Sequence, residues 1–417
     1  MKNTRRFLAF LTAVALCLTV TASFAESRPK LTMMFSAGGS GNALKSSAER
    51  FGEQNGVDVE VLLFSISEVY EKQVLALYGK VGTPDLIAMD DTWFPLMKEY
   101  LAPLEFDEAF NNAFIPSMRE SWMSGQVQYG VPVRMGDEVI VYRKDVLEGA
   151  GIDPMSLTTW EAVYAAAQKL TDADAGVYGW VGGYNEAAYL VAIWLNIMSS
   201  YGVDIFNEDQ TGFAFNTEMG VKGTQMFVDL TARCATPGIL SYGYSEEIEA
   251  LQNGSAVMGQ LWSARYASVD KEGLEHYGRY DVLPFYPYGE GSGLQTGVDR
   301  VNGWGIGINK YSENQELAKE FLAFVGSYEE QLRLAVEMSN SPVCSGIFQE
   351  ESYLAVAPVA SNMESAMANG IARPQHILWA EIEASISLYL QRAVIGEITA
   401  AEALEQAEKA CLEILGQ

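Results

Sequence analysis

The chain has 417 residues, 49% of them hydrophobic and 19% charged, a composition that excludes an intrinsically disordered protein and suffices for two hydrophobic cores. It contains 54 acidic and 27 basic residues, so its formal net charge is −27 and its surface repels nucleic acid and anionic membranes as partners. With only two histidines and no CxxC pair, the sequence argues against a zinc or haem site, and no cofactor is expected.

The first 25 residues have the pattern of a secretory signal peptide. Three basic residues precede an apolar run over residues 7–20, and small residues then lead to Ala25, after which we expect cleavage. No later stretch is long and apolar enough to span a bilayer. The sequence therefore predicts an exported protein, located in a periplasm or at the cell surface.

The four cysteines bear on whether the exported protein carries a lipid anchor and whether it forms disulfides. Cys17 lies inside the apolar run of the signal, behind Leu16, which is a poor context for lipid attachment. A soluble exported protein is therefore favoured over a lipid-anchored one. The mature chain keeps Cys234, Cys344 and Cys411, an odd number that cannot all pair with one another. Cys411 falls on the apolar stripe of a terminal helix, which is typical of a small core residue.

Two consecutive units at the start of the mature chain predict a mostly parallel sheet. The first joins a strand over 30–35, a glycine-rich loop over 37–41, a helix and a strand over 57–61. The second joins a helix over 69–78 to a buried strand over 85–89. The glycine loop matches neither phosphate-binding consensus, so it is either a turn that lets a ligand approach the backbone or a turn only.

A polar and aromatic cluster, Asp90 to Trp93, follows the second buried strand. In open parallel sheets, ligands bind beyond the carboxyl ends of the strands, and this cluster falls there. Asp91 is equally well explained as the cap of a following helix and as a ligand contact. Trp93 is interpreted as a ligand contact rather than as packing.

The stretch 125–145 predicts a passage of the chain from one sheet to another. Pro132 interrupts an otherwise continuous strand pattern, because proline cannot donate to a sheet ladder. Arg134, Asp137 and Glu138 then lie inside an apolar run, where charges are costly unless they are paired or hydrated. Two interpretations stay open: a crossing that lines a water-filled gap, and an ordinary exposed hairpin with a charged tip.

Later elements repeat this arrangement of strand ends followed by aromatic or charged residues. A strand and glycine loop over 176–185 lead to Tyr184, and a short strand over 256–260 leads to Trp262. A glycine-broken apolar strand over 299–308 contains Trp304 and is a candidate second crossing. Near the C-terminus, Arg373 and Pro374 precede a helix that contains Trp379.

An ordered set of motifs covers nearly the whole mature chain. They are Thr83 to Asp90 followed by Trp93, Tyr129 to Pro132, Val141 to Asp145 with Gly149 to Gly151, Trp160 and Glu161, Asn253 to Met258 with Trp262, Asn302 to Gly305, and Leu317 to Leu322. No single motif is specific for a protein family, but the complete set in this order is. On these motifs the chain resembles the extracellular solute-binding proteins of bacterial ABC importers, in the sugar-binding group that includes maltose-binding protein.

The resemblance implies an α/β, two-lobed periplasmic-binding-protein fold of type II, with mixed, mostly parallel sheets joined by hinge segments. One lobe comprises residues 26–134 with 303–326, the other 138–300 with 330–417, and the hinges lie near 134–138, 300–304 and 326–330. The ligand is expected in the cleft between the lobes. An ABC permease is the implied partner of the protein, which is expected to be a monomer.

The resemblance also suggests ligand-binding residues. Trp93, Trp262, Trp304 and Trp379 correspond to sugar-stacking aromatics, since an indole ring packs on the weakly apolar face of a sugar. Charged side chains suit the hydroxyl edges, for which Asp91, Arg134, Asp137, Glu138 and Arg373 are candidates, with Tyr184 beside them. Asp137 or Glu138 would replace a family carboxylate that falls near Gly136. Arg373 before Pro374 resembles members that bind sugar alcohols and small sugars.

The leading hypothesis is a non-enzymatic receptor that captures a sugar or sugar alcohol and delivers it to a permease. One alternative is an exported carbohydrate-active enzyme, because paired carboxylates and tryptophans also suit glycoside hydrolysis. No two isolated carboxylates divide into an acid and a nucleophile, so no catalytic or metal-binding residue is assigned. A second alternative keeps the fold but binds a polyamine or another small solute.

Overall fold

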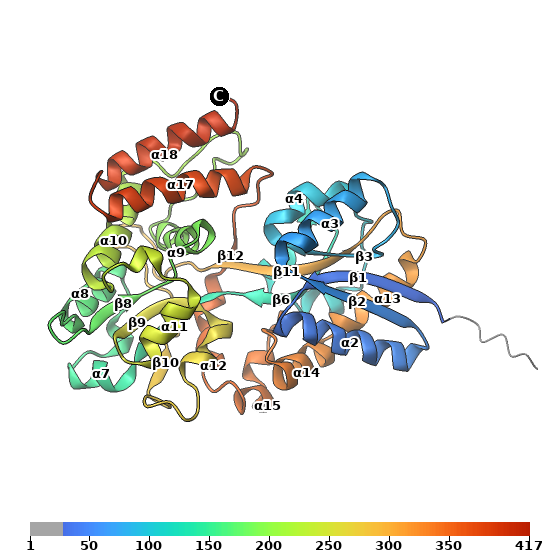
Figure 1. Ribbon diagram of the computed structural model, residues 1–417, viewed down its shortest axis with the longest axis horizontal. Coiled ribbons are helices and arrows are strands. Elements are labelled where there is room, and N and C mark those ends of the chain that lie inside the picture. The colour runs from blue at the N-terminus through green and yellow to red at the C-terminus, as the bar shows by residue number, and fades with distance from the viewer. Residues whose placement is uncertain (1–27) are drawn as a thin grey trace, which may run out of the picture.

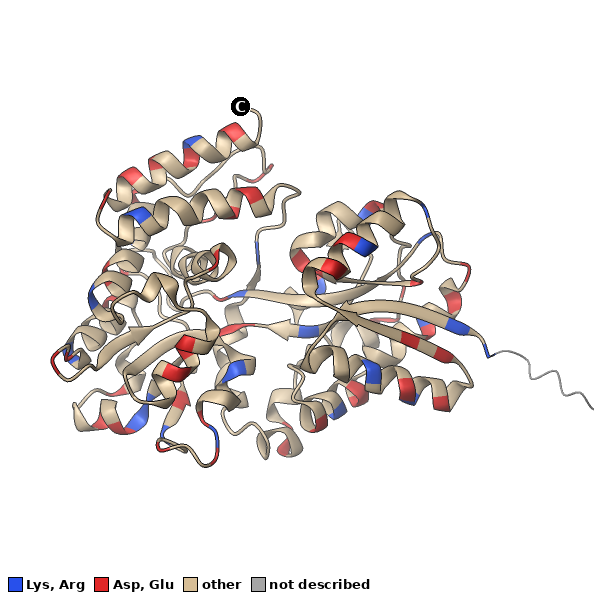
Figure 2. Ribbon diagram, viewed as in Figure 1, with Lys and Arg blue, Asp and Glu red and all other residues tan. Residues whose placement is uncertain are grey.

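The computed structural model describes residues 28–417, and the predicted signal peptide, its cleavage after Ala25 and Cys17 lie outside the described residues. The chain forms two lobes, each built around one sheet (Figure 1). Acidic residues are spread over the surface helices of both lobes rather than gathered in one patch (Figure 2). None of the helices between residues 28 and 417 combines the length and the apolar character that a membrane crossing needs.

The first lobe contains a six-stranded sheet in the order β2-β1-β3-β11, with β6 and β12 both paired to β11. Its strands are β1 (Lys30–Ser36), β2 (Asp58–Phe64), β3 (Leu86–Asp90), β6 (Val131–Gly136), β11 (Arg300–Ile308) and β12 (Ile371–Ala372). β1 runs parallel to β2 and β3, as the two successive units predict, and β11 is antiparallel to β3 and β6. Gly303 and Gly305 lie against Met118 and Trp122, where a side chain would clash, which explains the glycines of this buried strand.

Helices cover both faces of this sheet (Figure 1). They are α2 (Gly39–Asn55), α3 (Ile66–Tyr78), α4 (Phe94–Met97), α5 (Glu108–Asn112), α6 (Pro116–Glu120), α13 (Gln315–Val325) and α14 (Tyr328–Met338). Helix α2 ends at Gly56, whose left-handed conformation glycine adopts without strain. Helix α3 begins at a capping box of Ser65 and Glu68. A two-stranded hairpin, β4 (Met123–Ser124) and β5 (Val127–Gln128), precedes β6.

The second lobe contains a four-stranded sheet in the order β10-β7-β9-β8. Its strands are β7 (Glu138–Arg143), β8 (Tyr178–Val181), β9 (Ala256–Trp262) and β10 (Tyr280–Val282). Its helices are α7 (Lys144–Gly149), α8 (Trp160–Leu170), α9 (Ala187–Ser200), α10 (Glu218–Cys234), α11 (Tyr244–Gln252), α12 (Tyr266–Val269), α16 (Ala360–Ala366), α17 (Trp379–Val394) and α18 (Ala400–Ile414), and α15 (Glu351–Leu354) lies between α14 of the first lobe and α16. Trp160, Trp180 and Trp194 are fully buried in its core. Cys234, Cys344 and Cys411 are free and buried.

Two segments carry the chain between the lobes. β6 pairs with β11 in the first sheet, β7 pairs with β9 and β10 in the second, and Asp137 alone separates them. At the start of β11, the backbone N–H of Arg300 donates to the side-chain oxygen of Asn196, on α9 of the second lobe, at 2.7 Å. Asn302 to Ile306 then pair with β6 in the first lobe. The chain changes sheet between β6 and β7, whereas β11 begins beside α9 of the second lobe and pairs only within the first sheet.

The expected third hinge near 326–330, with residues from 330 onward in the second lobe, does not agree with the structure. Gly326 ends α13 in a packed turn, and α14 lies against α2, where Ser47 donates to the carboxylate of Glu330 at 2.6 Å. The chain stays in the first lobe as far as Ser345, whose N–H donates to the carbonyl of Ala113 at 2.9 Å. It reaches the second lobe at α16, where Asn362 donates to the carbonyl of Val282 at 3.2 Å.

Candidate functional site

Two carboxylates at the carboxyl end of β3 hold an arginine from the C-terminal part of the chain. The Arg373 guanidinium donates to Asp90 at 2.8 Å and to both carboxylate oxygens of Asp91, which is 0% exposed. Asp90, rather than Asp91, caps the following turn by accepting from the N–H of Thr92 at 3.2 Å. Burial raises the pKa of Asp91 to about 7, although the Arg373 charge acts against this rise. Asp91 therefore serves to position Arg373, and neither alternative considered for it from the sequence includes this role.

Four aromatic rings form a cluster beside these charges. Trp304 is 4% exposed and lies between Phe35, at a centroid distance of 4.9 Å, and Trp93, at 5.1 Å. Tyr70 of α3 contacts the other side of Trp93 at 5.1 Å. Trp93 stays partly exposed, whereas Trp304 is enclosed. Trp304 thus braces Trp93, and Trp93 is the ring of this cluster that can present a face to a ligand.

The second lobe presents its own aromatic group at the end of β9. Trp262 is partly exposed, and its indole N–H donates to the hydroxyl of Tyr244. The guanidinium of Arg265 lies 3.5 Å from the centre of the Tyr244 ring, and the centres of the Tyr189 and Tyr244 rings are 3.9 Å apart. Sequence reasoning found Trp262 but missed the other three residues. Arg265 follows Trp262 by three residues, which is a usable signal, but Tyr189 lies in an apolar helix that is typical of a core.

Arg134 links the two groups. It lies on β6 of the first lobe, opposite Trp304 in the β11 register, and is partly buried. Burial lowers the pKa of its guanidinium, Asp90 opposes this effect, and Arg265 and Tyr244 of the second lobe also act on it. β7 pairs Glu138 with Trp262 at the end of β9, so Arg134, just before Glu138, and Arg265, just after Trp262, lie at the same end of these two strands.

Asp137 and Glu138 are not placed where they could face a ligand. Asp137 is 0% exposed and accepts from the hydroxyl of Ser263. Glu138 is 3% exposed and accepts from Asn196 at 2.7 Å and from Gln260 at 2.5 Å. Burial raises the pKa of Asp137 to about 6 and that of Glu138 to about 8. Asp137 and Glu138 are thus buried and each accepts from a side chain inside the protein, although Asp137 Oδ2 has no partner among the described residues, so neither carboxylate faces the space where we expected a ligand.

Tyr184 and Trp379 also belong to packed regions. Tyr184 is fully buried, and its hydroxyl accepts from the indole N–H of Trp180 at 3.1 Å. Trp379 is 3% exposed, and its indole N–H donates to Glu383 at 3.2 Å. Tyr184 follows a glycine loop, and Trp379 is the first residue of α17. In such a position, sequence alone cannot distinguish a core residue from a ligand contact. The structure assigns Tyr184 to the core and Trp379 to the base of α17.

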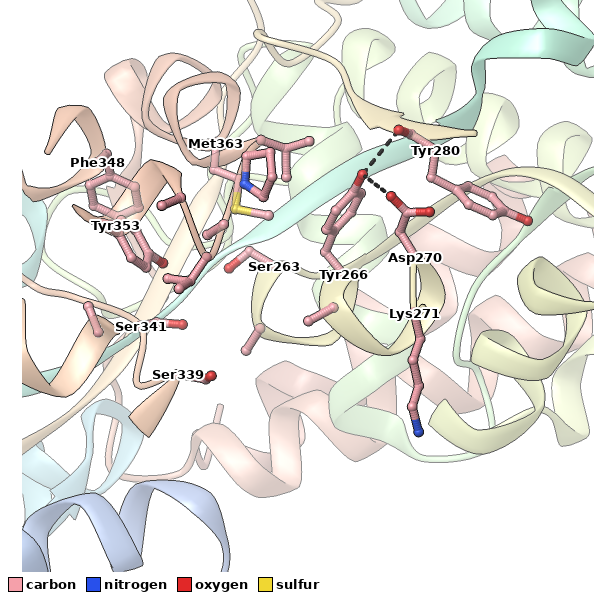
Figure 3. A pocket seen from close by; sticks show the side chains of 18 of the residues that line it. Ser263, Tyr266, Asp270, Lys271, Tyr280, Ser339, Ser341, Phe348, Tyr353 and Met363 are labelled. Carbon is pink, nitrogen blue, oxygen red and sulfur yellow. Dashed lines mark hydrogen bonds between the residues drawn. The ribbon is translucent and has the colours of Figure 1, made fainter. Parts of the chain in front are cut away.

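A cavity of about 500 Å³ lies elsewhere, between α12 and the segment from α14 to α16 (Figure 3). Tyr266, Tyr280 and Tyr353 line it, together with Asp270 and Ser339. The hydroxyl of Tyr266 lies 3.2 Å from the carboxylate of Asp270 and 3.0 Å from the carbonyl of Tyr280. None of the ten residues predicted to bind a ligand lines this cavity. Within residues 28–417, no cluster of three histidine, cysteine or acidic residues could hold a metal ion.

Comparisons with known proteins agree on one family. The family model of bacterial extracellular solute-binding proteins matches residues 37–332. A probable ABC transporter-binding protein of Deinococcus radiodurans is 24% identical over 87% of this chain and 88% of its own length. The maltose-bound MalE3 structure of T. maritima has a TM-score of 0.78 and 26% identity, covering 93% of this chain and 99% of that one. A solute-binding protein of Agrobacterium radiobacter K84 in complex with ribitol has a TM-score of 0.76 and 22% identity, covering 93% and 98%.

Proposed function

Because the chain belongs to the family of bacterial extracellular solute-binding proteins, we propose that it captures a sugar or a sugar alcohol between its two lobes. The predicted family and the two-lobed α/β periplasmic-binding-protein fold are confirmed. The family consists of receptors rather than enzymes, so the alternative of a carbohydrate-active enzyme falls. The protein acts outside the cytoplasmic membrane, as its family does, and delivers its ligand to the membrane subunits of an ABC importer.

One observation carries the choice of site. Glu138 pairs with Trp262 where β7 begins and β9 ends, which brings Arg134 of the first lobe and Arg265 of the second lobe to the same end of these strands, and Trp262 donates to Tyr244, the ring under Arg265. Trp93 adds a second partly exposed indole ring from the first lobe. Indole faces pack against the C–H face of a sugar, and guanidinium groups bond to its oxygen atoms. Closing the lobes around a ligand would strengthen these bonds by excluding water.

Ligands named for similar proteins support a carbohydrate. The MalE3 structure contains maltose and the Agrobacterium structure contains ribitol, a sugar and a sugar alcohol. A polyamine is disfavoured, because the cationic Arg134 and Arg265 would repel it. We further propose that the lobes move about the segments 134–138 and 300–304, that the signal peptide is removed after Ala25, and that the protein is a monomer.

The test is thermal unfolding of the purified protein with sugars, sugar alcohols, polyamines and amino acids. A ligand at 100 times its dissociation constant stabilises the folded state by about 2.7 kcal/mol, a readily measured shift. We expect a shift with a sugar or sugar alcohol that is lost in Trp262→Ala, without a large fall in the melting temperature of the free protein. Tyr277→Ala, which removes an aromatic side chain 54% exposed outside the site, is the control. A shift with polyamines or amino acids alone would overturn the proposal.

A further inference from the structure

Two arginines at the proposed site have no anionic partner. Most arginines in residues 28–417 have a carboxylate oxygen within 4 Å, including Arg373 with Asp90 and Asp91. Among the described residues, Arg119, Arg134 and Arg265 have none, and only Arg134 and Arg265 of these belong to the proposed site. In a chain with 54 acidic and 27 basic residues, a partly buried arginine without a carboxylate is unexpected. Their isolation suggests that they are kept free for another anion.

The two guanidinium groups also repel each other. Arg134 projects from β6 in the first lobe, and Arg265 lies over the Tyr244 ring in the second lobe, 3.5 Å from the ring centre. The charge of Arg265 acts on Arg134 to lower its pKa, in addition to the effect of burial. Closure of the lobes would bring such charges into a less polar space, where repulsion grows. Asp90 opposes this effect at Arg134, but a neutral ligand would leave Arg265 without an anionic partner.

Nearby acceptors are already engaged or are not charged. Asp90 and Asp91 accept from Arg373, and burial raises the pKa of Glu247 well above its ordinary value, although the Arg265 charge acts against this rise. Glu186 is an exposed carboxylate beside Tyr189, at the margin of the group. The Tyr244 hydroxyl already accepts from Trp262. The site therefore has a surplus of hydrogen-bond donors and calls for a ligand rich in acceptors.

Resting on the proposed function, we propose that the ligand is an acidic sugar, whose carboxylate is held between Arg134 and Arg265 while its carbon face lies on Trp262 or Trp93. A carboxylate offers two coplanar oxygen atoms that match the fork of a guanidinium group. It also neutralises the repulsion that closure would otherwise increase. Uronic and aldonic acids combine such a carboxylate with the hydroxyls and C–H faces that the tryptophans and Arg373 suit.

Isothermal titration of the full protein separates the two proposals. The probes are galacturonate, glucuronate and gluconate, their neutral counterparts galactose, glucose and sorbitol, and glucose 6-phosphate. We expect at least one carboxylate sugar to bind at least tenfold more tightly than its neutral counterpart, with an affinity that falls as salt increases. Arg134→Gln and Arg265→Gln should each weaken that binding at least tenfold, whereas Arg279→Gln, on an exposed ion pair with Asp145, should not.

Each outcome decides one proposal. Equal or tighter binding of the neutral sugars would overturn the acidic ligand and keep the sugar receptor. Binding of glucose 6-phosphate but of no carboxylate sugar would overturn the carboxylate assignment. No carbohydrate binding at all would overturn the proposed function itself. If Arg134→Gln lowers the melting temperature, Arg134→Lys replaces it, because lysine keeps the positive charge but lacks the two-pronged guanidinium group. Unchanged uronate affinity in both Arg134→Lys and Arg265→Gln would overturn the inference.

Discussion

Replacing Glu138 by glutamine should flatten the pH dependence of the stability of the folded protein. Glu138 is buried at the crossing between the lobes, and burial raises its pKa from 4.5 to about 8. Between these values the folded state holds a proton that the unfolded state releases, so the free energy of unfolding decreases as pH rises. Each pH unit contributes at most about 1.4 kcal/mol, or about 4 kcal/mol between pH 5 and pH 8. Glutamine resembles the neutral acid and still accepts from Asn196 and Gln260.

The measurement is urea denaturation at pH 5, 6, 7 and 8, followed by tryptophan fluorescence, for the wild type and Glu138→Gln. The variant should have nearly wild-type stability at pH 5 and should be the more stable protein at pH 8. Burial also raises the pKa values of Asp137 and Asp299. Both residues are present in the wild type and in Glu138→Gln, so the difference in unfolding free energy between the two proteins reports the titration of Glu138 and its interaction with these two carboxylates. Glu249→Gln, at an exposed position on α11, should run parallel to the wild type. A difference between wild type and Glu138→Gln that does not change with pH would refute the reasoning, because it would mean that Glu138 is ionised in the folded state.

Three further substitutions test how the hinge, the charged cluster and the core are held. Asn196→Ala removes the acceptor of the Arg300 N–H and a donor to Glu138, so unfolding measurements should give a loss of about 2–4 kcal/mol; a loss below about 1 kcal/mol would show that Asn196 does not join the two crossings. Arg373→Gln should cost about 3 kcal/mol at pH 8 and less at pH 5, because a protonated Asp91 needs no cation, and a cost independent of pH would contradict this role. Tyr184→Phe should lower stability by about 1 kcal/mol in urea denaturation without changing ligand affinity, whereas a fall in affinity at unchanged stability would return Tyr184 to the binding site.

The fold was predictable because its signals are local. Proline at 132 and the glycines of β11 mark the strands that pass between the lobes, and the alternation of strands and helices marks the parallel part of the first sheet. The third connection was not predictable in the same way. Gly326 ends a helix, and a glycine between two helices has the same sequence pattern whether the turn is packed or acts as a joint. Only the contact of α14 with α2 decides between them.

Site residues were harder to predict because burial is not local. Asp137 and Glu138 were recognised as charges that must be paired or hydrated, yet their partners Ser263, Asn196 and Gln260 come from distant parts of the chain. A sequence pattern gives the requirement for a partner but not its source. For the same reason, no pattern shows that Asp90 and Asp91 are engaged by Arg373, more than 280 residues later.

The site and the crossing meet at adjacent positions of one strand. Trp262 is the last residue of β9 and lies opposite Glu138 in the register of β7. The next residue, Ser263, donates its hydroxyl to the carboxylate of Asp137 and its backbone N–H to the carbonyl of Asp137, the latter at 2.9 Å. The tryptophan that we assign to the ligand is thus adjacent in the chain to Ser263, which is hydrogen-bonded to Asp137, the residue between the two sheets. We expect a ligand that displaces Trp262 to act on the crossing through Ser263, because a buried and hydrogen-bonded residue transmits displacement rather than absorbing it.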